Sequence, residues 1–288
     1  MKLVRYGVPG AEKPGLIDSA GELRDLSLFI ADIDQYALGR VGLQRLASVD
    51  PATLPKVEGN PRFGAPVAHV GKMICVGMNY ADHAAETGAP VPEQPVLFMK
   101  ATSAIMGPND DVVIPRGSTR TDWEVELGVV IGDVARDVTV ENALAHVAGY
   151  LVVNDVSERE FQFEHGGQWV KGKSCDTFGP LGPWLVTADE VANPQNLNLW
   201  LEVNGHRHQT GNTRTMVFGV AQLVSYISRY MTLMPGDVIS TGTPAGVGLG
   251  LKPPTYLRPG DVIELGIDGL GRQRQQVHAH PADQGGAR

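Results

Sequence analysis

The chain of 288 residues has few cysteines and no long apolar run. Its two cysteines, Cys75 and Cys175, lack CxxC spacing, which favours inert thiols over a disulfide or a zinc site. No stretch approaches the ~18 apolar residues of a membrane span, and residues 1–10 lack the apolar core of a signal peptide. These absences argue against a membrane protein and predict a cytoplasmic location.

Positive charge is scarce as well. There are 24 Lys and Arg against 32 Asp and Glu, a formal net charge of -8. Nucleic acids and anionic membranes require a concentrated positive surface, which no segment supplies, so we expect neither as a partner. What the chain does have is 35 Gly and 20 Pro, and so many turn residues favour a strand-rich fold.

The N-terminal part differs in character from the rest of the chain. Residues 1–70 predict a small α/β domain, with two short strands, an amphipathic run and a linker rich in proline and glycine. Residues 71–280 predict a second, mostly β domain. The last residues, 281–288, have too little apolar surface to pack and predict a flexible tail.

Apolar runs of strand length recur through the second part, and one helix interrupts them. The helix is predicted over 215–231, where apolar residues recur at steps of three and four. The strands are predicted at 72–77, 95–100, 112–115, 125–132, 149–155, 197–205, 237–242 and 261–267. The expected fold class is mostly β (α+β).

An acidic pattern lies in residues 121–133, TDWEVELGVVIGD. Because side chains alternate in a strand, Glu124 and Glu126 face one side and the apolar residues face the other. Two charges about 6 to 7 Å apart repel by roughly 2 to 3 kcal/mol at an effective dielectric of about 20. Asp155 ends a later apolar run, and three convergent carboxylates would suit Mg²⁺ or Mn²⁺. Taken alone, an ExE strand more often faces solvent and pairs with Lys or Arg from the next strand.

A histidine and a glutamate share one face of a short predicted helix. Asn79 fits an N-cap and Gly88 fits a C-terminal stop for the residues between them. His83 and Glu86 are three residues apart, so the carboxylate could orient an imidazole that acts on water. The simpler alternative is an ordinary surface pair.

Two further segments have the composition of ligand-binding loops. The first is a polar segment with Arg159, Gln162 and Lys173, which could cover a bound anion; the alternative is solvated charge on an exposed helix. The second, residues 240–250, lacks the Lys-Ser/Thr of a phosphate loop, which argues against nucleotide binding. Its N–H groups and Thr243 could instead line a pocket for a small carboxylate.

Six motifs in this order make the chain resemble the fumarylacetoacetate hydrolase family over residues 72–277. They are GMNYADHAAE, WEVELGVVIG, VVNDVSERE, KGKSCDTFGP, NGHRHQTGNT and TGTPAGVG. The resemblance implies a mixed β-roll or β-sandwich of the fumarylacetoacetase C-terminal type, a homodimer, and Mg²⁺ (or Mn²⁺) held by Glu124, Glu126 and Asp155. Some larger members carry a further acid where this chain has Met78, which favours a site of three carboxylates.

The resemblance also implies roles for other side chains. His83 and Glu86 would activate water, and Lys173 would support the reacting centre. The residues expected to contact substrate are Arg159, Gln162, Lys173 and Thr243. The segment GQWVKGKSCDTFGP resembles the corresponding segment of bacterial 2,4-diketo-3-deoxy-L-rhamnonate and L-fuconate hydrolases.

The expected activity is hydrolysis of a C–C bond in a 2,4-dioxo acid. The favoured substrate is a 2,4-diketo-3-deoxy sugar acid, which would give pyruvate and a hydroxy acid. Alternatives on the same site are acylpyruvate hydrolysis, oxaloacetate decarboxylation, isomerisation and ureidoglycolate cleavage. A non-enzymatic alternative is a protein that only binds keto acids, since family membership does not decide the substrate.

Overall fold

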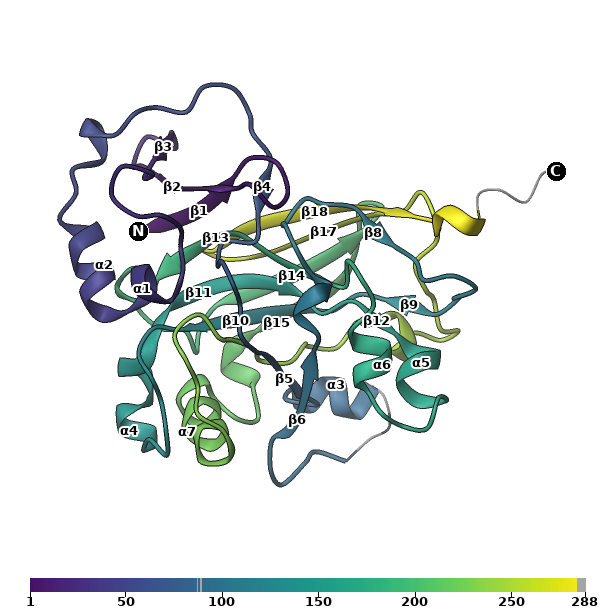
Figure 1. The fold of residues 1–288 in the computed structure, drawn as a ribbon. Helices are drawn as coiled ribbons and strands as arrows, with labels where there is room; N and C mark the ends of the chain where they lie inside the picture. The colour runs from purple at the N-terminus through teal and green to yellow at the C-terminus, as the bar shows by residue number, and fades with distance from the viewer. Residues whose placement is uncertain (87, 89, 284–288) are drawn as a thin grey trace.

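The computed structural model describes residues 1–86, 88 and 90–283 (Figure 1). Within these residues the strands form an eleven-stranded, a five-stranded and a two-stranded sheet. The helices are short and lie around the sheets rather than within them (Figure 1). The predicted mostly β fold is therefore confirmed.

The eleven-stranded sheet contains strands from nearly the whole chain. Its order is β3 (Leu23–Asp25), β2 (Lys13–Ile17), β1 (Lys2–Tyr6), β13 (Gly179–Thr187), β11 (Val147–Asn154), β10 (Val125–Ile131), β16 (Val238–Ser240), β5 (Met73–Gly77) and β6 (Val96–Lys100). Off this path, β4 (Phe63–Gly64) pairs with β1, and β7 (Ile105–Met106) pairs with β13. The sheet is mixed, because β16 runs parallel to β5 and β13 runs parallel to β7.

The other two sheets are smaller. The five-stranded sheet has the order β15 (His206–Asn212), β14 (Asn198–Val203), β17 (Val262–Ile267), β18 (Gly271–His278) and β8 (Val112–Val113). The two-stranded sheet pairs β9 (Thr121–Asp122) with β12 (Ser157–Glu158). One apolar core contains Leu127 of β10, Leu201 of β14 and Leu265 of β17, so the two larger sheets pack as a sandwich.

The helices are α1 (Gln35–Leu38), α2 (Arg40–Ala47), α3 (Ala81–Glu86), α4 (Val140–Ala143), α5 (Arg159–Phe163), α6 (Val170–Lys173) and α7 (Val220–Tyr230). Short 3₁₀ turns occupy Pro51–Thr53, Thr102–Ala104, Leu144–His146, Ala188–Glu190, Thr213–Thr215, Gly248–Gly250 and Pro281–Asp283. The helix predicted over 215–231 begins only at Val220, because Gly219 is its N-cap. Among the residues described, no helix combines the length and apolarity needed to cross a membrane.

The N-terminal part continues the large sheet. Strand β1 pairs antiparallel with β13, with Leu3 opposite Leu185. Leu3 and Leu38 share an apolar core with Leu151 and Leu185 of the second part. The domain boundary near residue 70 stays a prediction, but the two parts share one sheet and one core. Of the predicted flexible tail, residues 281–283 form a 3₁₀ turn, and 284–288 lie outside the described residues.

Candidate active site

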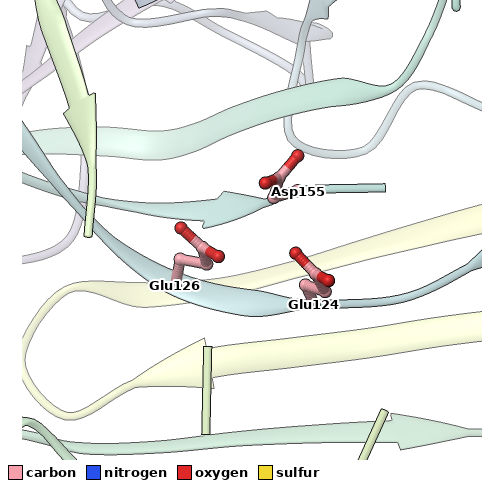
Figure 2. Close-up of side chains that lie close together, drawn as sticks. All are labelled: Glu124, Glu126 and Asp155. Carbon is pink, nitrogen blue, oxygen red and sulfur yellow. The ribbon is translucent and has the colours of Figure 1, made fainter. Parts of the chain in front are cut away.

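Three carboxylates converge where β10 and β11 lie side by side. The strands pair antiparallel, and the amide of Asp155 donates to the carbonyl of Glu124 at 2.9 Å. Figure 2 shows Glu124, Glu126 and Asp155 gathered on the same side of these strands. One oxygen from each carboxylate lies within 4.8 Å of the others, and all three residues are buried. The predicted convergence of these acids is present.

The opposite face of the strand is apolar, as the alternation predicts. Trp123, Val125, Leu127, Val129 and Ile131 all belong to the sandwich core. The solvent-facing alternative for the glutamates is wrong, since Glu124 is only 4% and Glu126 only 2% exposed. Strand β10 and the residues just before it are thus buried on both faces, with apolar residues in the core and the two glutamates in an internal site.

Buried cations lie between the acids. The Nζ of Lys173 lies 2.7 Å from Glu124 Oε2 and 2.8 Å from Asp155 Oδ2. The Nζ of Lys100 lies 2.5 Å from Asp155 Oδ1. Arg159 Nη2 bridges Asp122 and Glu124 at 2.8 Å each. Each of these pairs is shielded from solvent, where a charge is stable only if it is paired.

The two glutamates of the centre differ in their ionisation. Burial by itself raises the pKa of Glu124, but Lys173 and Arg159 overcome it and lower that pKa to about 2. For Glu126, burial dominates, and the charges of Asp155 and Glu124 add to it, so its pKa is raised well above the usual value. Both hydrogen bonds to Glu126, from Ser240 Oγ and the Gly242 amide, reach the same oxygen, Oε2.

The donor set fits a hard divalent cation. The charged groups of the centre are the carboxylates of Asp122, Glu124, Glu126 and Asp155 and the cations of Lys100, Arg159 and Lys173. When all four carboxylates are ionised, negative charge is in excess, and among the ion pairs of the described residues none involves Glu126. Oxygen ligands alone, without His or Cys, suit Mg²⁺ or Mn²⁺. Such an ion would also relieve the repulsion that raises the pKa of Glu126.

The histidine and glutamate of α3 form a pair beside this centre. His83 Nδ1 lies 3.6 Å from Glu86 Oε2, and the amide of Gly246 donates to both oxygens of Glu86 at 2.9 and 3.0 Å. Burial raises the pKa of Glu86, but the hydrogen bonds from His83 and Gly246 outweigh it, and the pKa is lowered. Glu86 therefore stays ionised beside the imidazole.

The start of α3 differs from the sequence prediction. The helix begins at Ala81, and the side chain of Asn79 binds elsewhere. Its amide nitrogen donates to the carbonyls of Phe218 and Thr241 at 3.0 and 2.8 Å, and its oxygen accepts from the amide of Phe218 at 2.8 Å. Asn79 thus ties the start of the helix to two distant parts of the chain.

A cavity of 300 Å³ opens over the carboxylates. Seven of the predicted site residues line it, namely His83, Glu124, Glu126, Arg159, Gln162, Lys173 and Thr243. Asp155 and Glu86 do not line it and lie behind Lys173 and His83 as their ion-pair partners. A larger hollow of 580 Å³ over α1 and α2 lies away from the carboxylate cluster, so the chemistry favours the smaller cavity.

The polar segment after β11 folds over the centre. It forms α5 and α6, which pack against each other (Figure 1). The alternative of solvated charges is wrong for Arg159 and Lys173, which are 4% and 2% exposed. Arg159 Nη1 also donates to Gln162 Oε1 at 3.1 Å, which orients the amide that lines the cavity. That this segment moves as a cover stays a prediction.

The glycine-rich loop holds the protein's own carboxylates. Besides binding Glu86 through Gly246 and Glu126 through Gly242, it binds Asp122 through the amides of Gly248 and Leu249, at 2.7 and 3.0 Å. These N–H groups are therefore not available to a substrate carboxylate, contrary to the expectation. Thr243 does line the cavity, while its hydroxyl donates to the carbonyl of Val125 at 2.9 Å.

Three important residues of the centre were not singled out from the sequence. Lys100 is the last residue of β6, a position like that of Asp155 after β11, and that placement at a strand end was its only signal. Asp122 ends β9, two positions before Glu124. Ser240 ends β16 and is the first residue of the glycine-rich loop. Only the fold brings each of them beside the carboxylates.

Comparison with known proteins agrees with this site. The family model described as fumarylacetoacetate (FAA) hydrolase C-terminal matches residues 72–278. A Burkholderia cenocepacia protein with a provisional hydrolase name is 64% identical over 278 residues, which cover 96% of this chain and 99% of the relative. The chain belongs to the fumarylacetoacetate hydrolase family and is an enzyme, as the motifs predict.

Solved structures of the family are similar over nearly the whole chain. A fumarylacetoacetate hydrolase from Exiguobacterium antarcticum is 40% identical with a TM-score of 0.87, over 97% of this chain and 100% of that one. A maleylpyruvate hydrolase from Sphingobium sp. SYK-6, in complex with manganese(II) and pyruvate, is 29% identical with a TM-score of 0.81, over 97% of this chain and 99% of that one. The structural similarity covers the N-terminal part of the chain as well as residues 72–278, which the family model matches.

Proposed function

We propose that this enzyme hydrolyses the C3–C4 bond of a 2,4-dioxo acid and releases pyruvate. One observation carries the proposal: a single cavity is lined by Glu124 and Glu126 of a hard-cation site and by a histidine that is paired with a half-buried carboxylate. The first group can hold the oxo-acid end of a substrate, and the second can act on water beside it.

Glu124, Glu126 and Asp155 would hold the divalent ion, Mg²⁺ or Mn²⁺. When bound, such an ion supplies Lewis acidity to the oxygens of an oxo acid. The manganese and pyruvate in the related maleylpyruvate hydrolase support this assignment. With all four carboxylates ionised, a dication and the three basic side chains would give the centre an excess of positive charge, which favours an anionic substrate.

Four polar side chains are positioned to receive the oxo-acid end. Arg159 and Lys173 are held at the cavity by ion pairs with the acids of the centre. Gln162 and Thr243 line the same cavity and are fixed by hydrogen bonds to Arg159 and to the main chain. Because these partners are buried, the groups are ordered before substrate arrives.

His83 would be the general base. The imidazole takes a proton from water, and Glu86 stabilises the imidazolium that forms. The resulting hydroxide attacks C4, and the C3–C4 bond breaks with its electron pair passing to C3 and the C2 oxygen. Lys173 stabilises the negative charge that develops there. Protonation of C3 gives pyruvate, and the C4 carbonyl becomes the second carboxylic acid.

Other reactions could use the same oxo-acid site. Decarboxylation of oxaloacetate, isomerisation and ureidoglycolate cleavage need no water attack at C4, so replacing His83 should affect them much less. A protein that only binds keto acids would bind oxalate stoichiometrically and turn over none of these compounds. The pairing of His83 with Glu86 beside the metal site favours hydrolysis, since binding alone does not require a general base. A homodimer stays part of the proposal.

The test measures pyruvate release from acylpyruvates and from 2,4-diketo-3-deoxy sugar acids, with and without EDTA. We expect turnover that EDTA stops and that Mg²⁺ or Mn²⁺ restores. Turnover that persists without metal, or an unchanged rate in Glu124→Ala, would contradict the proposal. Release of carbon dioxide from oxaloacetate without any hydrolysis of acylpyruvates would favour the decarboxylase.

A further inference from the structure

The cavity has a second wall, opposite in character to the acidic one. Its side chains are Val76, Met78, Phe98, Phe163, Trp169 and Leu249. Apart from the indole N–H of Trp169, which can donate one hydrogen bond, these side chains offer no conventional hydrogen-bonding group. A substrate that fills the cavity must therefore place an uncharged part against them.

Three of these side chains form one aromatic cluster. The ring centroids of Phe98 and Trp169 are 5.3 Å apart, and those of Phe163 and Trp169 are 5.9 Å apart. Trp169 lies tightly over Gly77, where a Cβ would come within 2.5 Å of its ring. The cluster is thus packed against the end of β5 and forms a continuous apolar surface.

This cluster begins directly beside the proposed oxo-acid site. The Nζ of Lys173 lies 5.0 Å from the centroid of the Phe98 ring. A substrate whose oxo-acid end reaches Lys173 therefore places the carbons beyond C4 along the aromatic cluster. At 300 Å³ the cavity lies at the lower end of the ~300 to 1,000 Å³ of small-molecule sites, so this tail is short.

The cations of the cavity are already paired. Among the lining residues that the structure describes, the basic ones are His83, Arg159 and Lys173. Arg159 pairs with Asp122 and Glu124, Lys173 pairs with Glu124 and Asp155, and His83 faces Glu86. A second carboxylate at the far end of a substrate would meet apolar rings rather than a counter-charge, which disfavours its binding.

We propose that the substrate carries its only charge at the oxo-acid end and has a short, uncharged C4 substituent. This inference rests on the proposed function and narrows it. It disfavours diacid substrates such as maleylpyruvate, the substrate in the name of a structural neighbour. It admits the one-hydroxyl, methyl-terminated tail of a 2,4-diketo-3-deoxy-6-deoxyhexonate.

The experiment compares substrates that differ only at the tail. The matched pair is 2,4-dioxoheptanoate, with a methyl terminus, and 2,4-dioxoheptanedioate, with a carboxylate terminus; 5-hydroxy-2,4-dioxohexanoate tests the single hydroxyl. Pyruvate release with Mg²⁺ present gives kcat/KM for each. We expect the monoacid to exceed the diacid by about 30-fold or more, and the hydroxy compound to stay within about 10-fold of the monoacid.

Two variants of Phe163 test whether the aromatic cluster causes the preference for the monoacid. Phe163 is 45% exposed on α5, so its replacement is compatible with folding. Phe163→Arg should favour the diacid and lower the ratio of kcat/KM for the monoacid to kcat/KM for the diacid by about 5-fold or more. Phe163→Leu should keep this ratio near that of the native enzyme. Because both substrates are measured on one preparation, the ratio does not depend on the fraction of folded protein.

The outcomes separate the two proposals. Pyruvate release from all compounds, with the diacid equal or preferred, would overturn the uncharged tail and leave the hydrolase intact. An unchanged ratio in Phe163→Arg would overturn the placement of the tail along the aromatic cluster. No pyruvate from any compound in the presence of metal would overturn the proposed function and the tail with it.

Discussion

The two sides of the cavity are built in different ways. The acidic side comes from long strands of the large sheet. Buried cations hold Glu124 and Asp155 there, and hydrogen bonds from Ser240 and Gly242 hold Glu126. The side with His83 comes from α3, a helix of six residues whose Glu86 is anchored by the amide of Gly246. Both sides contact the glycine-rich loop, but the acidic side is built on paired strands, whereas the reacting side is a short helix held by that loop.

The largest expected effect is loss of the acidic side. Glu124→Ala removes a proposed metal ligand and the partner of Lys173 and Arg159, so pyruvate release should fall by about 10³-fold or more. EDTA should act equally strongly on the native enzyme. The matched control is Glu58→Ala, an exposed glutamate far from the centre, which should keep full activity.

Loss of the reacting side should have a large effect of a different kind. His83→Ala should lower kcat by about 10² to 10⁴-fold, because a general base is removed. Metal affinity, measured by calorimetry, should stay within about 3-fold of the native value, since the described ligand cluster does not include His83. A joint fall in kcat and metal affinity would show that the two sides are not independent.

The two glutamates should have opposite effects on stability in the metal-free protein. Glu124→Gln leaves Lys173 and Arg159 short of negative charge and should cost about 3 kcal/mol at pH 7. Glu126→Gln removes a carboxyl whose pKa is raised, and its oxygen can still accept from Ser240 and Gly242, so it should stabilise by about 1 to 2 kcal/mol. Thermal unfolding with EDTA measures both.

The pH dependence gives the sign of each effect. A buried carboxyl with a raised pKa makes the folded protein less stable as pH rises above 4.5, the pKa of the unfolded chain. The gain in free energy of unfolding from Glu126→Gln should therefore grow from that pH upward. Glu124, with its pKa lowered to about 2, contributes stability that is present above 4.5 and lost as pH falls toward 2. The same sign for both variants at pH 7 would contradict the assigned shifts.

The smallest effect is expected at the edge of the acidic side. Thr243→Val removes a hydroxyl that donates to Val125 and accepts from Gln209 at 2.7 Å. KM should rise by about 3 to 10-fold with kcat nearly unchanged, and stability should fall by about 1 kcal/mol. If KM does not change, Thr243 supports the loop without contacting substrate.

The strands that could be predicted are those with apolar patterns. All eight predicted runs coincide with strands, because side chains that pack between two sheets must be apolar in regular positions. Strand β18 was not predicted, because two of its buried positions are the polar residues Gln273 and Gln275. Their amides donate to carbonyls such as those of Val152 and Pro108, so hydrogen bonds replace apolar burial there.

The site was predictable in part for the same reason. Glu124 and Glu126 interrupt an apolar strand, and Asp155 ends another, so their convergence follows from alternation and strand pairing. Lys100 and Asp122 form ion pairs with residues 55 and 37 positions away, and no local pattern indicates such partners. The glycine-rich loop was read as a ligand loop, although its amides bind the protein's own acids.

The sequence alone determined the class of fold, the acidic strand, and the ordered motifs that identify the family, because these depend on local alternation and on residue types. Only the tertiary structure decided which cation neutralises which acid and which glutamate retains an unusually high pKa. It alone showed that the cavity has an apolar second wall. Charge and burial depend on distances between segments far apart in the chain, and folding sets those distances.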